Sequence, residues 1–167
     1  MASLRAATPD DLKAVAEIYA HYVTHTVITF DEEPPDVPAW RDKHAGITAH
    51  GLPFLVSCAP GGEITGYAYA APWRPKPAYR HTVEDTVYLA PEWTGRGTGS
   101  ALLTALVEES ARAGARQMIA VISDTGSESS PALHRRHGFR ETGRLSAVGH
   151  KHDQWVDTLL MQRALVP

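Results

Sequence analysis

Several features that mark specialised classes of protein are scarce in this sequence. It has one cysteine in 167 residues, Cys58, which excludes an internal disulfide, and it has no apolar run long enough to cross a bilayer. The first residues lack the apolar stretch of a secretory signal. Lys and Arg number 16 and Asp and Glu number 19, and this net charge of −3 gives no electrostatic reason to bind nucleic acid or an anionic membrane. We therefore expect one globular domain over residues 1–167, located in the cytoplasm, with neither nucleic acid nor a membrane as its partner.

What the sequence does contain is a series of short apolar segments separated by turn and loop residues. Strands are expected at residues 4–6, 53–59, 64–73, 82–89, 117–122, 139–145 and 154–165, with Cys58 buried in the second and a possible bulge at Gly66 in the third. Helices are expected after the N-cap Thr8, at residues 37–49, at residues 101–113, and from the N-cap Ser130 to Gly138. Because some strands are joined by hairpins and others by helices, the order predicts a mixed α/β sheet.

The segment Thr94–Ser100 carries three glycines between a predicted strand and a predicted helix. Glycines allow positive φ and close approach of the backbone to a ligand. The first N–H groups of a helix have no internal partners, and the helix dipole adds partial positive charge there. The segment therefore predicts a site for a phosphate or pyrophosphate group.

Two common phosphate-binding motifs do not fit this loop. A P-loop requires Lys and then Ser or Thr after its last glycine, whereas Gly99 is followed by Ser100 and Ala101. A dinucleotide-binding loop requires a third glycine at the sixth position, which Ser100 occupies when counted from Gly95. Neither a nucleoside triphosphatase nor a dinucleotide enzyme is indicated.

The loop resembles the coenzyme A pyrophosphate loop of the GCN5-related N-acetyltransferases (GNAT), whose pattern is Gln/Arg-x-x-Gly-x-Gly/Ala. Gly138 and Phe139 match the Gly-Phe that follows a short helix later in that family, and the resemblance covers roughly residues 4–165. Further motifs are similar to the phosphinothricin acetyltransferase branch: Ala71–Arg74, Ala78–Tyr79, Thr82–Leu89, Leu133–Phe139, Val148–Lys151 and Trp155–Asp157. That branch acetylates the α-amino group of amino-acid analogues such as phosphinothricin, methionine sulfoximine and methionine sulfone. The resemblance implies a mixed, mostly antiparallel central sheet flanked by helices, acetyl-CoA as co-substrate, no metal, and a homodimer.

The resemblance also implies roles for particular residues. An amine attacks a thioester only when it is neutral, so a base is required, and Glu84 matches the carboxylate assigned to that role in the branch. His134 stands where many relatives have a tyrosine, and two roles stay open for it: proton donor to the leaving thiolate, or hydrogen-bond partner of the coenzyme. Arg74 is the expected clamp for a substrate carboxylate or phosphinate, and Phe30 and Tyr79 are expected to line the pocket with Glu84.

Coenzyme contacts are expected from two backbone segments. The family splays the strand before the loop from its neighbour, so the backbone of Val87, Tyr88 and Leu89 is expected to bind the pantetheine arm, with N–H groups around Tyr88 and Leu89 stabilising the oxyanion. The pyrophosphate is expected on Gly95, Arg96, Gly97, Thr98, Gly99 and Ser100. Two positions depart from the family pattern: Thr94 replaces Gln or Arg, and Ser127 stands where many relatives have an Asn that contacts the pantetheine arm.

Other activities are compatible with parts of the sequence. The acidic residues 31–33 would suit a cationic acceptor such as a protein N-terminus or a polyamine, whereas Arg74 favours a free amino acid. A coenzyme A-binding sensor without turnover is a further alternative, against which Glu84 and His134 argue. His21 and His25 lie one helical turn apart but have no third ligand at suitable spacing, so no metal site is predicted.

Overall fold

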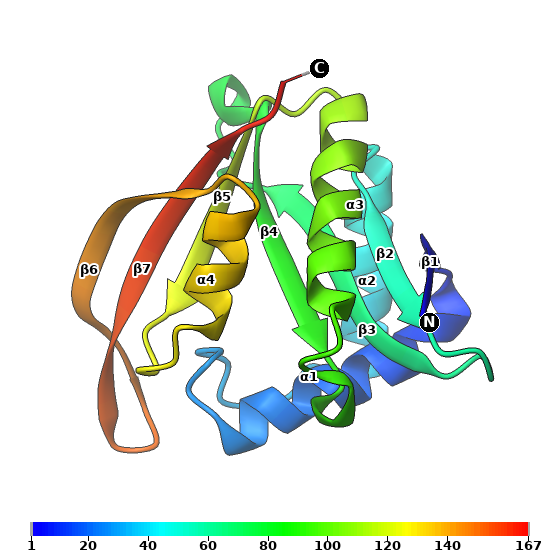
Figure 1. The fold of residues 1–167 in the computed structure, drawn as a ribbon, viewed down its shortest axis with the longest axis horizontal. Helices are drawn as coiled ribbons and strands as arrows, with labels where there is room; N and C mark the ends of the chain where they lie inside the picture. Colours follow the sequence, from blue (N-terminus) through cyan, green and yellow to red (C-terminus); the bar gives the residue numbers. More distant parts are fainter. Residues whose placement is uncertain (1, 167) are drawn as a thin grey trace.

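The computed structural model describes residues 2–166 (Figure 1). Its strands are β1 (Ser3–Ala6), β2 (Phe54–Cys58), β3 (Ile64–Pro72), β4 (Thr82–Leu89), β5 (Gln117–Ser123), β6 (Arg140–Lys151) and β7 (Gln154–Ala164). Its α-helices are α1 (Leu12–His25), α2 (Val37–Ala49), α3 (Thr98–Arg112) and α4 (Ser129–Arg136), and short 3₁₀ turns occur at Pro9–Asp11, Pro77–Tyr79 and Pro91–Trp93.

All strands belong to one sheet in the order β1-β2-β3-β4-β5-β7-β6. Every neighbouring pair is antiparallel except β4 and β5, which are parallel and are joined through α3. The prediction of a mixed, mostly antiparallel sheet flanked by helices is therefore confirmed.

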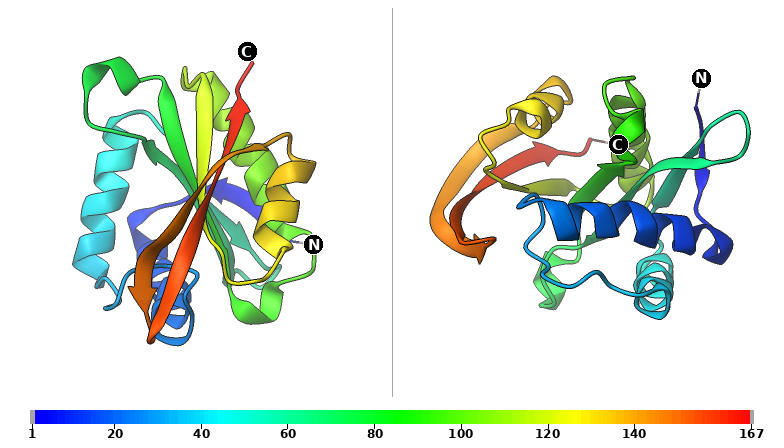
Figure 2. Two further views of the ribbon diagram at one scale, coloured as in Figure 1. Left: turned by 90° about the vertical axis from the view of Figure 1, so that its left-hand side faces the viewer. Right: turned by 90° about the horizontal axis from the view of Figure 1, so that it is seen from below.

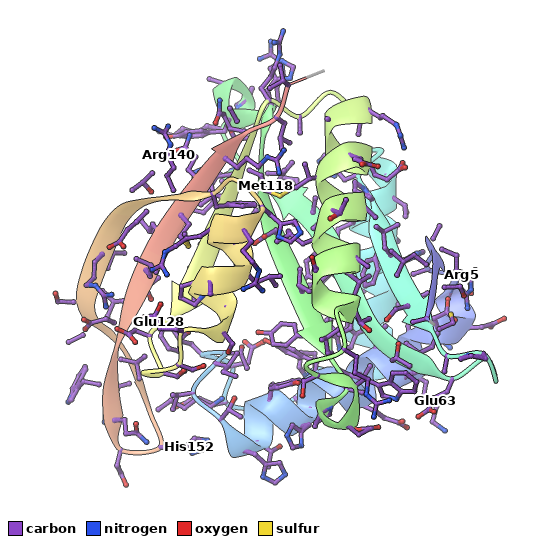
Figure 3. All side chains as sticks on the ribbon, viewed as in Figure 1. Arg5, Glu63, Met118, Glu128, Arg140 and His152 are labelled. Carbon is purple, nitrogen blue, oxygen red and sulfur yellow. The ribbon has the colours of Figure 1, made fainter. Side chains whose placement is uncertain are left out.

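Helices cover both faces of the sheet, α1 and α2 on one and α3 and α4 on the other (Figure 2). The core on the α3 side includes Leu102, Leu106 and Met118, and the core on the α1 and α2 side includes Trp40 and Tyr67. Met118 lies in the centre of the sheet, between α4 and α3 (Figure 3). Because both faces are covered, β2 is buried along its whole length, and Cys58 is buried within it as predicted.

The parallel strands β4 and β5 stay together over a short distance only. Their register pairs Thr82 with Gln117, Val83 with Met118 and Glu84 with Ile119, and pairing ends there. Beyond Glu84 the two strands part, and the views from two sides show them diverging toward the end of the sheet where α3 begins (Figures 1 and 2). On its other edge β4 remains paired with β3 as far as Leu89. The two backbones therefore separate in the middle of the sheet from Asp85 onward, and we call this separation of the strands the opening.

Several predicted boundaries are wrong for local reasons. The helix α3 begins at Thr98 rather than at residue 101, because Gly97 itself is the N-cap. The helix α4 is preceded by Glu128 as N-cap instead of Ser130. The strand β6 continues past residue 145 to Lys151, across a register irregularity where Ala147 has a φ of 51° and its N–H donates to the Asp157 carboxylate at 2.7 Å. A register shift opposite Gly66 confirms the predicted bulge at this part of β3.

Candidate active site

The glycine loop leads directly into the N-terminus of α3. Gly95 and Gly97 have φ values of 72° and 83°, a conformation that favours glycine, and a side chain at either position would meet nothing within 4 Å. The first helical hydrogen bond runs from the Ala101 N–H to the Gly97 carbonyl at 3.0 Å. The N–H groups of Thr98, Gly99 and Ser100 therefore precede the helical ladder and are available to an anion. This geometry suits a pyrophosphate.

Two loop side chains are held by contacts within the chain. The guanidinium of Arg96 lies over the Trp93 ring at 4.7 Å from its centroid. The hydroxyl of Thr94, at the position where the family has Gln or Arg, donates to the Pro91 carbonyl at 2.9 Å. The Thr94 side chain thus stabilises the preceding turn, and the backbone of the loop is what faces a ligand.

The strand β4 offers an unpaired backbone edge just before this loop. Hydrogen bonds at both ends of the β3–β4 ladder show that the even-numbered residues of β4 direct their backbone groups to β3. By alternation, the N–H groups of Val87 and Leu89 point into the opening toward β5, while that of Tyr88 points to β3. The Leu89 carbonyl accepts a hydrogen bond from the Tyr22 hydroxyl. Of the three residues predicted to contact the pantetheine arm, Val87 and Leu89 therefore have amides that face the opening.

Glu84 is the last residue of β4 that pairs with β5. Its side chain shares a face of the strand with Tyr88, whose ring packs against Tyr19 of α1 at 5.3 Å between centroids, so it points to the α1 and α2 side. Burial, and after it the charge of Asp85, raises the pKa of Glu84 above 4.5, although Arg74 and Lys43 act in the opposite direction. A carboxylate with a raised pKa beside two cations can accept a proton from an ammonium group near neutral pH.

Asp85 points to the opposite face of β4, because successive side chains of a strand alternate. Its carboxylate lies 2.8 Å from Nε2 of His134 in α4, and Nδ1 of His134 lies 2.8 Å from the Ser130 carbonyl. His134 is thus a buried side chain with both nitrogens occupied by protein acceptors. The predicted base and the predicted histidine lie on opposite faces of the sheet, at the point where β4 and β5 separate.

The residues expected to contact the substrate come from separate segments. Arg74, after the end of β3, is exposed and stacks on the Trp73 ring at 4.6 Å from its centroid. Tyr79 is exposed in the 3₁₀ turn that precedes β4. Phe30, in the connection between α1 and α2, has its ring against the backbone of Gly149 in β6. Arg74 is close enough to Glu84 to affect its pKa, whereas Phe30 lies toward the β6–β7 hairpin.

Ser127 lies in the loop between β5 and α4. Its hydroxyl lies 2.7 Å from the Ser129 hydroxyl and accepts from the Ser129 N–H at 3.3 Å. A short side chain engaged in this way has less reach toward a pantetheine arm than an Asn. Glu128, the next residue, is exposed and is the N-cap of α4.

A cavity of about 660 Å³ opens at the end of the molecule that holds the β6–β7 turn, where His152 lies (Figure 3). Its lining residues come from the end of α1, the following loop, the β5–α4 loop and the β6–β7 hairpin: Thr24, His25, Thr26, Val27, Ile28, Thr125, His152 and Gln154. None of the predicted site residues lines it. Among residues 2–166, no helix is long and apolar enough to cross a membrane and no group of three or more His, Cys, Asp or Glu side chains is placed to hold a metal ion.

Comparison with known proteins decides the family. Residues 13–139 match the model of the "Acetyltransferase (GNAT) family". The chain belongs to the GNAT family. It is 43% identical over 163 residues to a phosphinothricin N-acetyltransferase of Alcaligenes faecalis, covering 98% of this chain and 82% of that protein. It is 38% identical over 169 residues to an L-methionine sulfoximine/L-methionine sulfone acetyltransferase of Pseudomonas paraeruginosa, covering 99% and 96% of the two chains.

A solved structure agrees with these relatives. A GNAT superfamily phosphinothricin acetyltransferase from Sinorhizobium meliloti, crystallised in complex with acetyl-CoA, superposes with a TM-score of 0.94 at 44% identity. The match covers 98% of this chain and 88% of that one. This GNAT protein is therefore an N-acetyltransferase, and the predicted resemblance to the phosphinothricin and methionine sulfoximine branch is confirmed.

Some residues of this GNAT site were missed by sequence reasoning. Asp85 was noted only as part of a motif, although it contacts His134. Lys43 of α2 lies near Glu84, and its Nζ donates to the Tyr69 hydroxyl at 3.3 Å. Lys43 lies far from Glu84 in the sequence and on a helix with little amphipathic pattern, so no local signal connected the two.

Proposed function

We propose that this protein transfers the acetyl group of acetyl-CoA to the α-amino group of a small amino-acid-like substrate of the phosphinothricin, methionine sulfoximine or methionine sulfone type. The substrate class rests on two cations, Arg74 and Lys43, whose charges both act to lower the pKa of the half-buried Glu84. An α-amino acid presents an ammonium group for the base and a carboxylate for the cations. A polyamine presents only positive charge, which these two side chains would repel. The named activities of the relatives support the same class.

The coenzyme is proposed to enter on the α3 side of the sheet. The free N–H groups of residues 98–100 would bind its pyrophosphate, and the amides of Val87 and Leu89 would bind the pantetheine arm and the thioester oxygen. The acetyl-CoA bound in the solved relative supports this assignment. A thioester lying between β4 and β5 is open to both faces of the sheet, so the acceptor amine can approach from the side of Glu84.

The reaction we propose is direct transfer. Glu84 takes a proton from the substrate ammonium, and the neutral nitrogen then attacks the thioester carbonyl carbon. The carbonyl oxygen carries the negative charge of the tetrahedral state beside the backbone amides. The C–S bond breaks as the C–N bond is completed, and the sulfur leaves as a thiolate with the bonding electrons. Glu84 passes the first proton to solvent and then takes the second proton of the nitrogen, and the thiolate is protonated after release.

Release of free thiol from acetyl-CoA tests the proposal. The purified protein is offered phosphinothricin, methionine sulfoximine, methionine sulfone, common amino acids, spermidine and a short peptide. Saturable turnover with the amino-acid analogues is expected. Turnover confined to spermidine or peptide would overturn the substrate class, and coenzyme binding without turnover for any amine would favour a coenzyme A sensor.

We further propose that the enzyme is a cytoplasmic homodimer. Large apolar side chains are exposed on the outer hairpin of the sheet: Leu145 and Val148 on β6 and, with 70% of its surface exposed, Trp155 on β7. Neighbouring apolar side chains left in solvent on two adjacent strands support contact with a second copy. Analytical ultracentrifugation should give twice the chain mass, and Trp155→Lys should shift the equilibrium to the monomer. A wild-type protein that sediments as a monomer would contradict this.

A further inference from the structure

The reaction proposed above gives no role to the buried pair of Asp85 and His134. The carboxylate Oδ2 and the imidazole Nε2 are 2.8 Å apart, and the two side chains are 5% and 6% exposed. They come from β4 and α4 and are 49 residues apart in the sequence. Burying an ion pair costs desolvation energy that often equals its attraction, so stability alone is a weak reason for this arrangement.

Hydrogen-bond accounting assigns the protons of the ring. Nδ1 lies 2.8 Å from the Ser130 carbonyl, which can only accept, so Nδ1 carries a hydrogen. Nε2 faces the Asp85 carboxylate, which when ionised also only accepts, so Nε2 carries a hydrogen as well. An imidazole that donates from both nitrogens is an imidazolium. Burial alone would lower the pKa of His134, but the hydrogen bond and charge of Asp85, with the Ser130 carbonyl, raise it above 6.5.

The surroundings of the ring contain one charged partner. Asp85 faces it from β4, the carbonyl and hydroxyl of Ser130 face it from its own helix, and the Phe139 ring lies edge-on at 4.9 Å between centroids. Within residues 2–166, the charged side chain in contact with the His134 ring is that of Asp85. Removing the Asp85 charge should therefore lower the pKa of His134, because burial would then be opposed only by the hydrogen bond to the Ser130 carbonyl.

The position of the pair connects it with the reaction. Asp85 is the first residue of β4 beyond the last pair with β5, so it stands where the opening in the sheet begins. It faces the α3 and α4 side, from which the coenzyme is proposed to enter, while Glu84 faces the acceptor side. A thiolate that leaves within the opening would have the imidazolium on the coenzyme side and the base on the other.

We propose that Asp85 is the positioning residue for His134: its carboxylate fixes the imidazole beside the opening and keeps both nitrogens protonated, so that His134 offers the leaving sulfur a fixed positive charge rather than a proton. This inference rests on the proposed function. It replaces the two roles that the sequence left open for His134, because neither N–H is free to be transferred to the sulfur or to bind the coenzyme while both are bound to protein acceptors. The bond changes are those given above, and the thiolate takes its proton from solvent.

The first test measures the ionisation of His134 in coenzyme-free protein by NMR of the imidazole nitrogens, with His134→Gln to assign the signal. In the wild type, His134 should titrate above 6.5 with hydrogens on both nitrogens at neutral pH. In Asp85→Asn its pKa should fall by about 1 to 3, the range for loss of an opposite charge in contact. Asp10→Asn, which removes an exposed carboxylate at the start of the chain, should leave the titration unchanged.

The second test follows the pH dependence of kcat for the amine that the wild type acetylates best. If the charge of His134 is required, kcat falls as the pH rises through the pKa of His134, and Asp85→Asn should move this alkaline limb to lower pH by the same amount as the NMR pKa. A role confined to folding would lower the melting temperature without moving the limb.

Either measurement can overturn the proposal. A wild-type His134 that titrates at or below 6.5, or that carries one ring hydrogen at neutral pH, would show a neutral pair and reject it, and this needs no variant to fold. An unchanged alkaline limb in Asp85→Asn would also reject it. Failure of the proposed function would appear separately, as absence of turnover by the wild type, and would leave the NMR titration intact.

Discussion

The backbone of Gly149 in β6 lies against the ring of Phe30 in the connection between α1 and α2. A Cβ at position 149 would come within 2.3 Å of Cζ of Phe30, and two further ring atoms would lie within 2.7 Å. Two residues along the same strand, the buried Lys151 donates from Nζ to the Thr29 carbonyl at 2.9 Å. The strand β6 thus contacts this connection at two adjacent points. Gly149 leaves room for the Phe30 ring, and the Lys151 ammonium binds the Thr29 carbonyl.

Replacement of Gly149 by Ala should therefore act on Phe30. The aromatic ring cannot bend away, so it must move as a unit, and its partial exposure leaves solvent on one side of it. If Phe30 lines the substrate pocket, as the family resemblance predicts, Gly149→Ala should raise the KM for the amino-acid substrate several-fold and leave the KM for acetyl-CoA unchanged. Steady-state kinetics with each substrate varied in turn would measure both.

The same strand offers a matched control. A Cβ at Gly143 would meet nothing within 4 Å, so Gly143→Ala should leave both KM values at the wild-type level. Equal effects of the two replacements would show that β6 tolerates alanine poorly in general. If Gly149→Ala left the KM for the amino-acid substrate unchanged, Phe30 would not be a residue of the substrate pocket.

Glu84→Gln should remove most of the turnover. The amide keeps the size of the side chain but cannot take a proton, and loss of a general base typically costs about 10²- to 10⁴-fold in rate. The amides proposed to bind the coenzyme are untouched, so acetyl-CoA should bind with wild-type affinity in calorimetry. Turnover near the wild-type level would show that another group, or water, is the base.

The wild-type pH profile should carry the signature of Glu84. Its carboxylate form is the active one, and burial raises its pKa above 4.5, so kcat/KM should fall as the pH drops through a value higher than that of an ordinary Glu. Arg74→Gln removes a cation that acts against this rise and should move the acid limb further up. An acid limb at the same pH in this variant would show that the charge of Arg74 does not affect the pKa of Glu84.

Arg74→Lys is expected to weaken substrate binding although it keeps the charge. A guanidinium grips a carboxylate or phosphinate with two parallel hydrogen bonds and lies flat on Trp73, whereas an ammonium can do neither in the same way. The KM for the amino-acid analogue should rise by about 10-fold, the equivalent of about 1.4 kcal/mol. For a substrate analogue whose carboxylate is replaced by an amide, the wild type and Arg74→Lys should have the same KM. A KM difference that persists with this analogue would contradict the role of Arg74 as a carboxylate clamp.

Sequence reasoning succeeded where the signal was local. The loop around Gly95 and Gly97 and the helix that follows are encoded within a few residues, and both are present in the structure, with the helix starting three residues earlier than predicted. The second half of β6 was missed because Ala147 adopts a left-handed conformation and interrupts the alternation that identifies a strand. The start of α4 was misplaced because its N-cap, Glu128, makes no side-chain capping hydrogen bond and is not a residue type that marks a helix start.

Contacts between residues far apart in the sequence could be identified only from the structure. The pair of Asp85 and His134, the approach of Lys43 to Glu84, and the seat of Phe30 on Gly149 each join segments far apart in the sequence. One sequence gives no covariation from which such pairs could be inferred. Because Glu84 and Asp85 are adjacent in a predicted strand, the sequence did indicate that they face opposite sides of the sheet. Which of the two faces the acceptor and which faces the coenzyme depends on the helices that cover each side.

Gly66 in β3 should be sensitive to any side chain, because it pairs with Leu89 at the end of β4 and lies against the Leu89 side chain. A Cβ there would come within 2.6 Å of Cδ2 of Leu89 and 3.0 Å of the Tyr88 carbonyl oxygen. The Leu89 side chain must move, and with it the strand end whose amides face the opening. Gly66→Ala should lower the free energy of unfolding by about 1–3 kcal/mol, as overpacking does, and raise the KM for acetyl-CoA.

Gly46 in α2 provides the opposite case for the same chemical change. A Cβ there would meet nothing within 4 Å, and alanine in a helix is favoured over glycine by about 0.5–1 kcal/mol. Gly46→Ala should therefore raise the free energy of unfolding in urea denaturation while leaving the KM for acetyl-CoA unchanged. If Gly66→Ala and Gly46→Ala changed stability in the same direction, the space around the new methyl group would not determine the outcome. The predicted clash between a Cβ at position 66 and the Leu89 side chain would then be wrong.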